Sequence, residues 1–219
     1  MAGVGGSGGG VGGRGAGGGK MALRSLSYRL HDALNVPLVG ALSVMCFGGL
    51  LGAFDTVRIT HIFVAYIVVD TLWIVLFPSA VPRFAWAIIL HHILTFFILL
   101  HPLRYPEHSI ETCRDGIVEL NTFFLISRRQ LQRGSALNVL CDLCYKATLS
   151  IRFIWQPYLI YHFRHITHMD QGYPVAEHAM VMISQILLCV FNIGIVIPGM
   201  LPKRKKIGEK SGGGWRKEA

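Results

Sequence analysis

Charged side chains are scarce in this chain, which holds 15% Asp, Glu, Lys and Arg but 52% hydrophobic residues over its 219 positions. A soluble domain carries about 25% charged residues, so the shortage argues against a soluble fold and favours a surface that faces lipid. Cysteine is scarce as well. The five cysteines are an odd number and lie mostly in apolar stretches, so they predict no disulfide framework.

Acidic residues are fewer than basic ones, 12 against 21, and the formal net charge is +9. Such a charge is found in nucleic-acid-binding proteins, but here the basic residues cluster before the first apolar run and after the last one, at residues 203–206. Basic clusters beside membrane spans set orientation and contact lipid headgroups. We therefore expect these basic residues to interact with the lipid bilayer and not with nucleic acid.

Composition divides the chain into three parts. Residues 1–24 are rich in glycine, which has great backbone freedom and no side chain to bury, so we expect a disordered tail without the apolar core of a signal peptide. Residues 25–202 contain the apolar runs and form the expected transmembrane domain. Residues 203–219 form a basic tail.

Six apolar segments follow one another within this domain, and each has roughly the 17–25 residues that cross a bilayer core. They are residues 36–54, 59–77, 84–103, 110–127, 136–162 and 175–201. The fourth contains acidic and basic residues and needs protein to cover its polar face. Pro157 predicts a kink or break near the end of the fifth. The sequence therefore predicts an all-α, polytopic membrane protein with six transmembrane helices.

The loop charges predict the orientation. With six spans, both basic tails and the loops 78–83 and 128–135 lie on one side, which then collects most of the Lys and Arg residues. Basic loops stay in the cytoplasm, so both termini are expected to be cytosolic. Lys217, three from the end, resembles part of a retrieval signal of endoplasmic reticulum membrane proteins, and an ordinary basic tail is the alternative. We expect the endoplasmic reticulum or another endomembrane.

From the second span onward, each predicted helix carries polar side chains on one face. An ionisable side chain at the centre of a span costs about 2.5–3.5 kcal/mol on insertion scales, so we expect these groups to share a protected interior. The alternative is that they only join the helices through hydrogen bonds and ion pairs. The candidates for the interior are Asp70, His91, His92, Thr95, Asp115, Glu119, Arg152 and Asn192.

Histidine also recurs before the last span, at His162, His165 and His168, which raises the question of a metal centre. Membrane di-iron enzymes need a larger set of histidines in HxxxH and HxxHH boxes on the cytosolic side, and the sequence has no such box. We therefore predict no metal and no other cofactor.

Three strings resemble, in this order, the TLC domain, a membrane domain named after the TRAM, Lag and CLN proteins. They are YIVVD ending at Asp70, HHILT beginning at His91, and ELNTFF beginning at Glu119. Arg152 with Pro157 and then Asn192 add further matches, and the resemblance runs from about residue 40 to residue 200. It implies a barrel-like bundle of six membrane helices around a central cavity for an acyl chain.

The best-understood enzymes of that family, the ceramide synthases, join a fatty acyl-CoA to a sphingoid amine and carry an HD segment on the span after the histidine pair. Here Arg114 and Asp115 stand at that place, and the later Asp is missing. His31 and Asp32 form an HD pair, but they precede the first apolar segment and are not expected to substitute. The chain looks more like the small TLC-domain proteins that are not ceramide synthases.

The leading expectation is a multi-pass membrane protein of lipid handling or homeostasis that binds a lipid or acyl chain inside the bundle. Asp70, Thr95, Asp115, Glu119, Arg152 and Asn192 would contact that lipid. The first alternative is an N-acyltransferase of ceramide-synthase type that takes acyl-CoA as substrate and uses His91 or His92 as general base or acyl acceptor. The second is a non-catalytic protein that binds cargo or a partner. The sequence identifies no protein partner.

Overall fold

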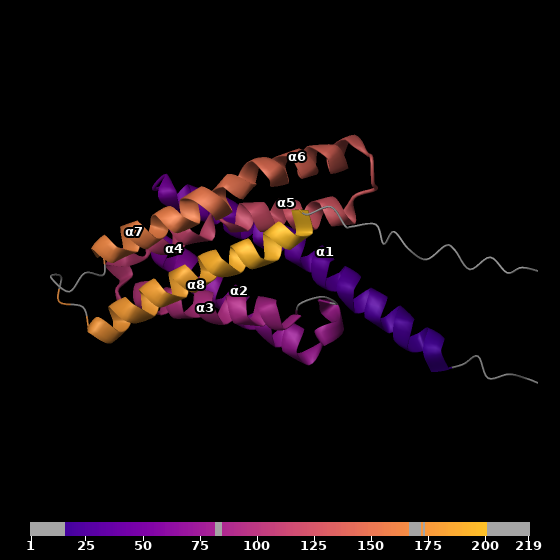
Figure 1. Cartoon of the computed structure of the whole chain (residues 1–219), viewed down its shortest axis with the longest axis horizontal. Helices are drawn as coiled ribbons and strands as arrows, with labels where there is room; N and C mark the ends of the chain where they lie inside the picture. The colour runs from indigo at the N-terminus through magenta and orange to yellow at the C-terminus, as the bar shows by residue number, and fades with distance from the viewer. Residues whose placement is uncertain (1–15, 82–84, 167–171, 173, 201–219) are drawn as a thin grey trace, which may run out of the picture.

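The described part of the chain is helical. The computed structural model describes residues 16–81, 85–166, 172 and 174–200, and none of these residues lies in a β-strand (Figure 1). This confirms the predicted all-α class. The helices are α1 Ala16–Leu50, α2 Thr56–Leu76, α3 Ala85–Arg104, α4 Ile110–Gly116, α5 Glu119–Gln130, α6 Ala136–Ser150, α7 Gln156–Ile166 and α8 Val175–Met200, with the short helices η1 Pro78–Ala80 and η2 Pro106–His108 and a π-helical turn at Ile151–Trp155.

Within the part of the chain that the structure describes, four helices are long and apolar enough to cross a membrane, namely Leu26–Leu50 of α1, all of α2 and α3, and Val175–Gly194 of α8. They match the first, second, third and sixth predicted segments. The fourth segment is divided into α4 and α5, because the N–H of Val118 bonds the carbonyl of Asp115, three residues back, and interrupts the regular helix. The fifth is divided into α6, the π-helical turn and α7. By length and composition, the structure therefore supports four spans.

The helices lie along a common axis, and the bundle has two ends (Figure 1). We call one end the near end, because α2 ends there and α3 begins there. The start of α1 and the end of α8 also lie toward the near end. At the far end, α3 ends and α8 begins. Helix α1 begins at Ala16, so residues 16–24 are helical although composition predicted disorder over residues 1–24. Residues 1–15 and 203–219 lie outside the described residues.

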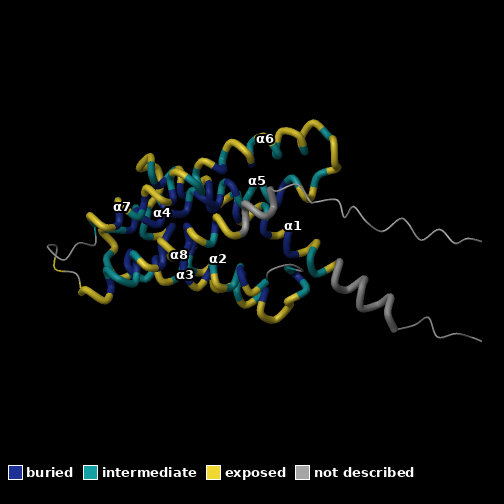
Figure 2. Tube along the Cα trace, in the orientation of Figure 1, coloured by how far each residue is buried: buried dark blue, intermediate teal, exposed yellow. Residues whose placement is uncertain are grey.

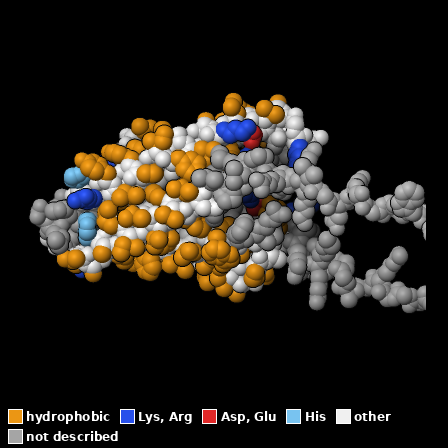
Figure 3. Space-filling model, in the orientation of Figure 1, with side chains coloured by type: hydrophobic (Ala, Val, Ile, Leu, Met, Phe, Trp, Pro, Cys, Tyr) orange, Lys and Arg blue, Asp and Glu red, His pale blue; other side chains and the backbone are white. Residues whose placement is uncertain are grey.

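Polar side chains are buried unusually often. Among the described residues, 21 buried side chains are polar or charged and 22 are hydrophobic. Large apolar side chains are exposed instead, and Figure 3 shows them covering the visible face of the bundle. Buried stretches run along the inner sides of the helices in Figure 2. This distribution is expected of a protein whose surroundings are lipid and whose polar groups are protected inside.

Glycine brings α4 close to α1 and α2. A Cβ atom on Gly116 would lie 2.7 Å from both Cys46 Sγ on α1 and Phe63 Cε2 on α2. On α1, a Cβ atom on Gly49 would lie 2.6 Å from Cys113 Sγ on α4. Small residues allow membrane helices to approach closely. These contacts hold α4, which carries two buried acidic residues, against the apolar packing of α1 and α2.

The irregularity predicted at Pro157 is present one turn earlier, as the π-helical turn Ile151–Trp155. Proline has no N–H to donate to the carbonyl four residues before it, so the regular helix cannot continue through this point. Single π-helical turns often occur at functional sites, because they redirect a side chain. The side chain carried by this turn toward the interior is Arg152.

Candidate functional site

Three helices meet at Asp70, a buried carboxylate on α2. Its Oδ1 accepts hydrogen bonds from His31 Nε2 at 2.9 Å and from Asn35 Nδ2 at 3.1 Å, both on α1. Its Oδ2 lies 3.6 Å from His92 Nε2 on α3. On the other side of that ring, His92 Nδ1 lies 3.0 Å from Thr71 Oγ1. We call these five residues the Asp70 cluster, in which one carboxylate bonds one imidazole ring and lies near a second.

Helical spacing explains why two members of the Asp70 cluster lie side by side on α1. His31 and Asn35 are four residues apart, so both project from one face of α1. Asp70 lies six residues before the end of α2 at Leu76, which is about 9 Å along the helix axis. His31 and Asp32, which precede the first predicted segment, lie within α1 and are both buried, and His31 contacts Asp70.

A small cavity lies deeper in the bundle, next to the second histidine. Its volume is about 10 Å³, close to what one water molecule needs. We call it the central cavity. Five of the eight candidate residues line it, and they come from α3, α4, α5 and α8. The lining is Phe63, His91, Thr95, Asp115, Val118, Glu119, Gln156, Leu188 and Asn192.

His91 and His92 have different surroundings, as adjacent positions on a helix require. The ring of His91 stacks on Phe191 of α8 at 5.2 Å between centroids. Its Nδ1 is buried and has no hydrogen-bond partner among the described residues. A buried polar atom normally has a partner, so this nitrogen beside a water-sized cavity marks a place for a water molecule or a ligand.

Arg152 lies on the π-helical turn and bonds residues of both α5 and α8. Its Nε donates to Asn121 Oδ1 at 2.5 Å, its Nη1 to Asn192 Oδ1 at 2.7 Å and its Nη2 to Thr122 Oγ1 at 2.7 Å. Glu119, on the cavity wall, interacts with this guanidinium electrostatically. The planar fork therefore fixes α5 and α8 around the cavity while its positive charge stays inside the bundle.

Two amides extend the polar interior from Asp115. Gln156 Nε2 donates to Asp115 Oδ1 at 2.8 Å, and Gln185 Nε2 donates to Gln156 Oε1 at 2.9 Å. Both glutamines are almost fully buried. The chain of bonds links α4 to α7 and α8.

The far end holds a second polar cluster. His101 Nδ1 lies 2.9 Å from Glu177 Oε1, and His101 Nε2 lies 2.8 Å from His108 Nδ1. Arg104 also donates to Glu177, at 3.3 Å. His108 lies in η2, outside the candidate spans. Burial and the neighbouring His101 lower the pKa of His108, although Glu107 and Glu111 act in the opposite direction.

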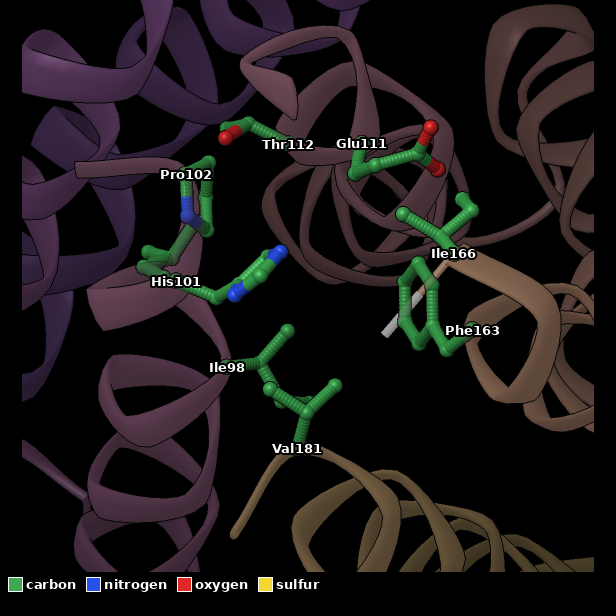
Figure 4. A pocket seen from close by; sticks show the side chains of 9 residues that line it. Ile98, His101, Pro102, Glu111, Thr112, Phe163, Ile166 and Val181 are labelled. Atoms are coloured by element: carbon green, nitrogen blue, oxygen red, sulfur yellow. The ribbon is translucent and has the colours of Figure 1, made fainter. Parts of the chain in front are cut away.

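Glu111 forms the inner part of this end. Its Oε2 lies 2.9 Å from His162 Nε2, and its Oε1 accepts from Arg114. A second cavity of about 10 Å³, the far cavity, separates Glu111 from His101, and Figure 4 shows the two side chains on either side of it. Apolar side chains complete the lining: Ile98, Leu99, Pro102, Phe163, Ile166 and Val181, with Thr112 as a further polar member.

The structure brings all eight candidate residues into one continuous interior. His91, Thr95, Asp115, Glu119 and Asn192 line the central cavity, His92 contacts Asp70, and Arg152 bonds Asn192. Six residues that complete the network were not among the sequence-based candidates: His31, Asn35, Thr71, Glu111, Asn121 and Gln156. A weak signal existed for the first two, because they lie one helical turn apart.

This arrangement can perform acid–base chemistry. An imidazole held between a carboxylate and a hydroxyl, as His92 is, has a fixed orientation and can accept or donate a proton. Among the residues that the structure describes, no group of three or more His, Cys, Asp or Glu side chains is placed to hold a metal ion. His168 of the histidine series lies outside those residues.

Comparison of the chain with models of protein families, with curated proteins and with solved structures finds no match in any of the three.

Proposed function

We propose that this chain is a multi-pass membrane protein of the TLC type that handles membrane lipids, and that the polar end of a lipid or acyl chain engages the central cavity. The observation that supports this most strongly is the convergence of the eight candidate residues on one buried interior. Such groups are costly in lipid and usually serve a function where they are retained. The organelle in this proposal is the endoplasmic reticulum or another endomembrane.

A six-span arrangement fits the packing. The contacts follow a closed order, from α1 to α2, α3, α8 and α7, through the π-helical turn to α6, and then to α5 and back to α1. In this proposal α4 with α5 is one span and α6 with α7 is another, and each relies on neighbours to cover its polar face. Helix α1 starts and α8 ends toward the same end of the bundle, which supports an even number of spans (Figure 1). The basic tails then place both termini in the cytosol.

The size of the central cavity limits how a lipid binds. A space for about one water molecule cannot hold an acyl chain. His91 and its stacking partner Phe191 are partly exposed, and His91 also lines the cavity. In this proposal the lipid therefore inserts only its polar end past Phe191, and its tail stays among the lipid-facing side chains of α3 and α8.

A second candidate function, acyl transfer, is favoured by one observation, the oriented imidazole of His92 between Asp70 and Thr71. An amine nitrogen would attack the carbonyl carbon of an acyl-CoA thioester, and the carbon–sulfur bond would break. His92 would accept the amine proton and return it to the departing thiolate. Asp70 would hold the ring and stabilise its protonated form.

The test replaces His91 and His92 together with glutamine and compares total lipid extracts of cells that make equal amounts of protein. His61→Gln is the matched control, because His61 is an exposed histidine on α2 whose ring bonds its own helix, at Val57 O. We expect the double variant alone to change a specific lipid and to lose lipid that co-purifies in mild detergent. A folded double variant with unchanged lipids and unchanged co-purification would refute the proposal.

An acyl adduct or acyl-CoA that co-purifies with the wild-type protein would favour the transferase over simple lipid binding. Mass spectrometry of the intact protein detects such an adduct. The adduct should be absent from the double variant and present in His61→Gln.

A further inference from the structure

Titratable side chains are not confined to the lipid site of the proposed function. They continue from the Asp70 cluster through the central cavity to the far-end cluster. On α3 alone, His92 and His101 are nine residues apart, which is about 14 Å along the axis. The series therefore occupies the middle of the bundle, where an ionisable group is least favourable.

The near half of the series is closely spaced. His31 and His92 both contact Asp70, at 2.9 and 3.6 Å. The rings of His92 and His91 follow at 5.8 Å between centroids. Two buried polar atoms in this half, Asp32 Oδ2 and His91 Nδ1, have no partner among the described residues. Each of these atoms is expected to bond a water molecule. The one on Asp32 lies at the outer part of the series, and the one on His91 lies at the central cavity.

The two cavities lie at two of the gaps in the series. The central cavity separates His91 from the carboxyl groups of Asp115 and Glu119. Asp115 is one turn along α4 from Glu111, so the two carboxyl groups project from the same face. The far cavity then separates Glu111 from His101. Each cavity has room for about one water molecule, which is what a proton needs to pass between groups that do not touch.

The far half reaches the surface by two routes. His101 contacts His108 at 2.8 Å, and Glu111 contacts His162 at 2.9 Å. The side chain of His162 is 23% exposed, and His108 is also partly exposed. At the near end, the side chains of His31 and Asp70 keep 8% and 9% exposure. The series therefore reaches the surface at the far end, and at the near end its outermost members lie just below the surface.

We propose that this series of imidazole and carboxyl groups, joined by one water molecule in each cavity, conducts protons across the membrane. Chains of Asp, Glu and His inside a bundle are the usual means of moving protons through membrane proteins. A proton passes along hydrogen bonds without a pore, whereas a hydrated metal ion does not fit a space of about one water molecule. The path is therefore selective for protons. This activity does not depend on lipid binding.

The experiment uses the full chain reconstituted into phosphatidylcholine vesicles with a pH-sensitive dye inside. A potassium gradient with valinomycin drives protons inward. We expect vesicles with wild-type protein to acidify faster than vesicles without protein. Glu111→Gln and Asp70→Asn should each abolish the protein-dependent part of the rate, because each removes a group that carries the proton. The same vesicles with a sodium-sensitive dye should show no protein-dependent sodium entry.

Asp142→Asn is the matched control. Asp142 lies on α6, where it forms ion pairs with Lys146 and Arg128, and it is not part of the proposed proton path. It should conduct as the wild type does. Elution and thermal unfolding in detergent establish that each variant is folded before it is tested. A wild-type rate equal to that of protein-free vesicles would overturn the proposal, as would sodium entry at a comparable rate or full conduction by folded Glu111→Gln. Altered lipids in the His91 and His92 double variant would not rescue it, so the two proposals fail separately.

Discussion

Asp70 provides the sharpest test of the interior, because one carboxylate joins α1, α2 and α3. Replacing it with alanine removes the acceptor of two hydrogen bonds, from His31 Nε2 and Asn35 Nδ2, and removes the negative charge 3.6 Å from His92. The partners stay buried after the substitution. We therefore expect Asp70→Ala to destabilise the bundle far more than a typical change at one polar position in a membrane helix.

The expected size follows from the number and charge of the contacts. Hydrogen bonds between membrane helices average about 0.6 kcal/mol and reach about 1.7. Bonds to a charged group are stronger, and breaking a buried pair by removing one partner costs about 3–5 kcal/mol. Asp70→Ala should reach this range. Asp70→Asn should cost about 1–2 kcal/mol, because an oxygen remains to accept a bond.

The free energy of unfolding is measured in mixed micelles by titration with a denaturing detergent, followed by circular dichroism. Asp142→Asn makes the same chemical change in a half-exposed ion pair and should cost no more than about 1 kcal/mol. In the Asp70→Ala background, His31→Ala should cost less than it does in the wild type, because the bond between His31 and Asp70 is already missing. A loss below about 1 kcal/mol for Asp70→Ala, or equal losses for the two asparagine variants, would refute the reasoning.

Three further predictions concern packing, the arginine and pH. Gly116→Ala should cost about 1–3 kcal/mol in the same titration, because the new methyl group overlaps Cys46, whereas Gly194→Ala, with nothing within 4 Å, should be neutral. Arg152→Lys should cost about 2 kcal/mol or more, because an ammonium cannot reproduce the three bonds of the fork, and an unchanged midpoint would contradict this. Since the pKa of His108 is lowered in the fold, its protonation favours unfolding, and stability should fall as the pH drops below its ordinary pKa of about 6.5. Thermal melts at stepped pH should show a smaller loss of stability for His108→Asn than for the wild type. Equal losses for the two proteins would contradict this role of His108.

The convergence of the polar candidates could be predicted because the rule behind it acts on each residue separately. An ionisable group on an apolar helix must leave the lipid, and helical spacing decides which groups share a face. His91, Asp115 and Glu119 come from different helices, yet each satisfies this rule, and all three line the central cavity. The four most apolar segments could be predicted for the same local reason.

The partners of these residues could not be predicted, because pairing depends on contacts between segments that are distant in the chain. His31 bonds Asp70, 39 positions away, and no periodicity in either segment indicates this contact. Helix α1 also extends beyond its apolar run, so the residues before the run enter the bundle. Gln156 was missed for a similar reason, since it follows the π-helical turn, which changes the face that each later residue of the segment presents.

The two proposals make opposite demands on the central cavity. Lipid binding needs the space beside His91 to admit a polar head, whereas proton conduction needs the same space to hold one water molecule in contact with both sides. A bound head that carries its own donors and acceptors can replace that water, but an apolar group cannot, because the hydrogen bonds across the gap would be lost. Phe191 stacks on His91, which lines the cavity, so a lipid head that enters beside His91 has to pass this ring. Occupancy by a lipid head and conduction through a water molecule therefore compete for one position beside His91.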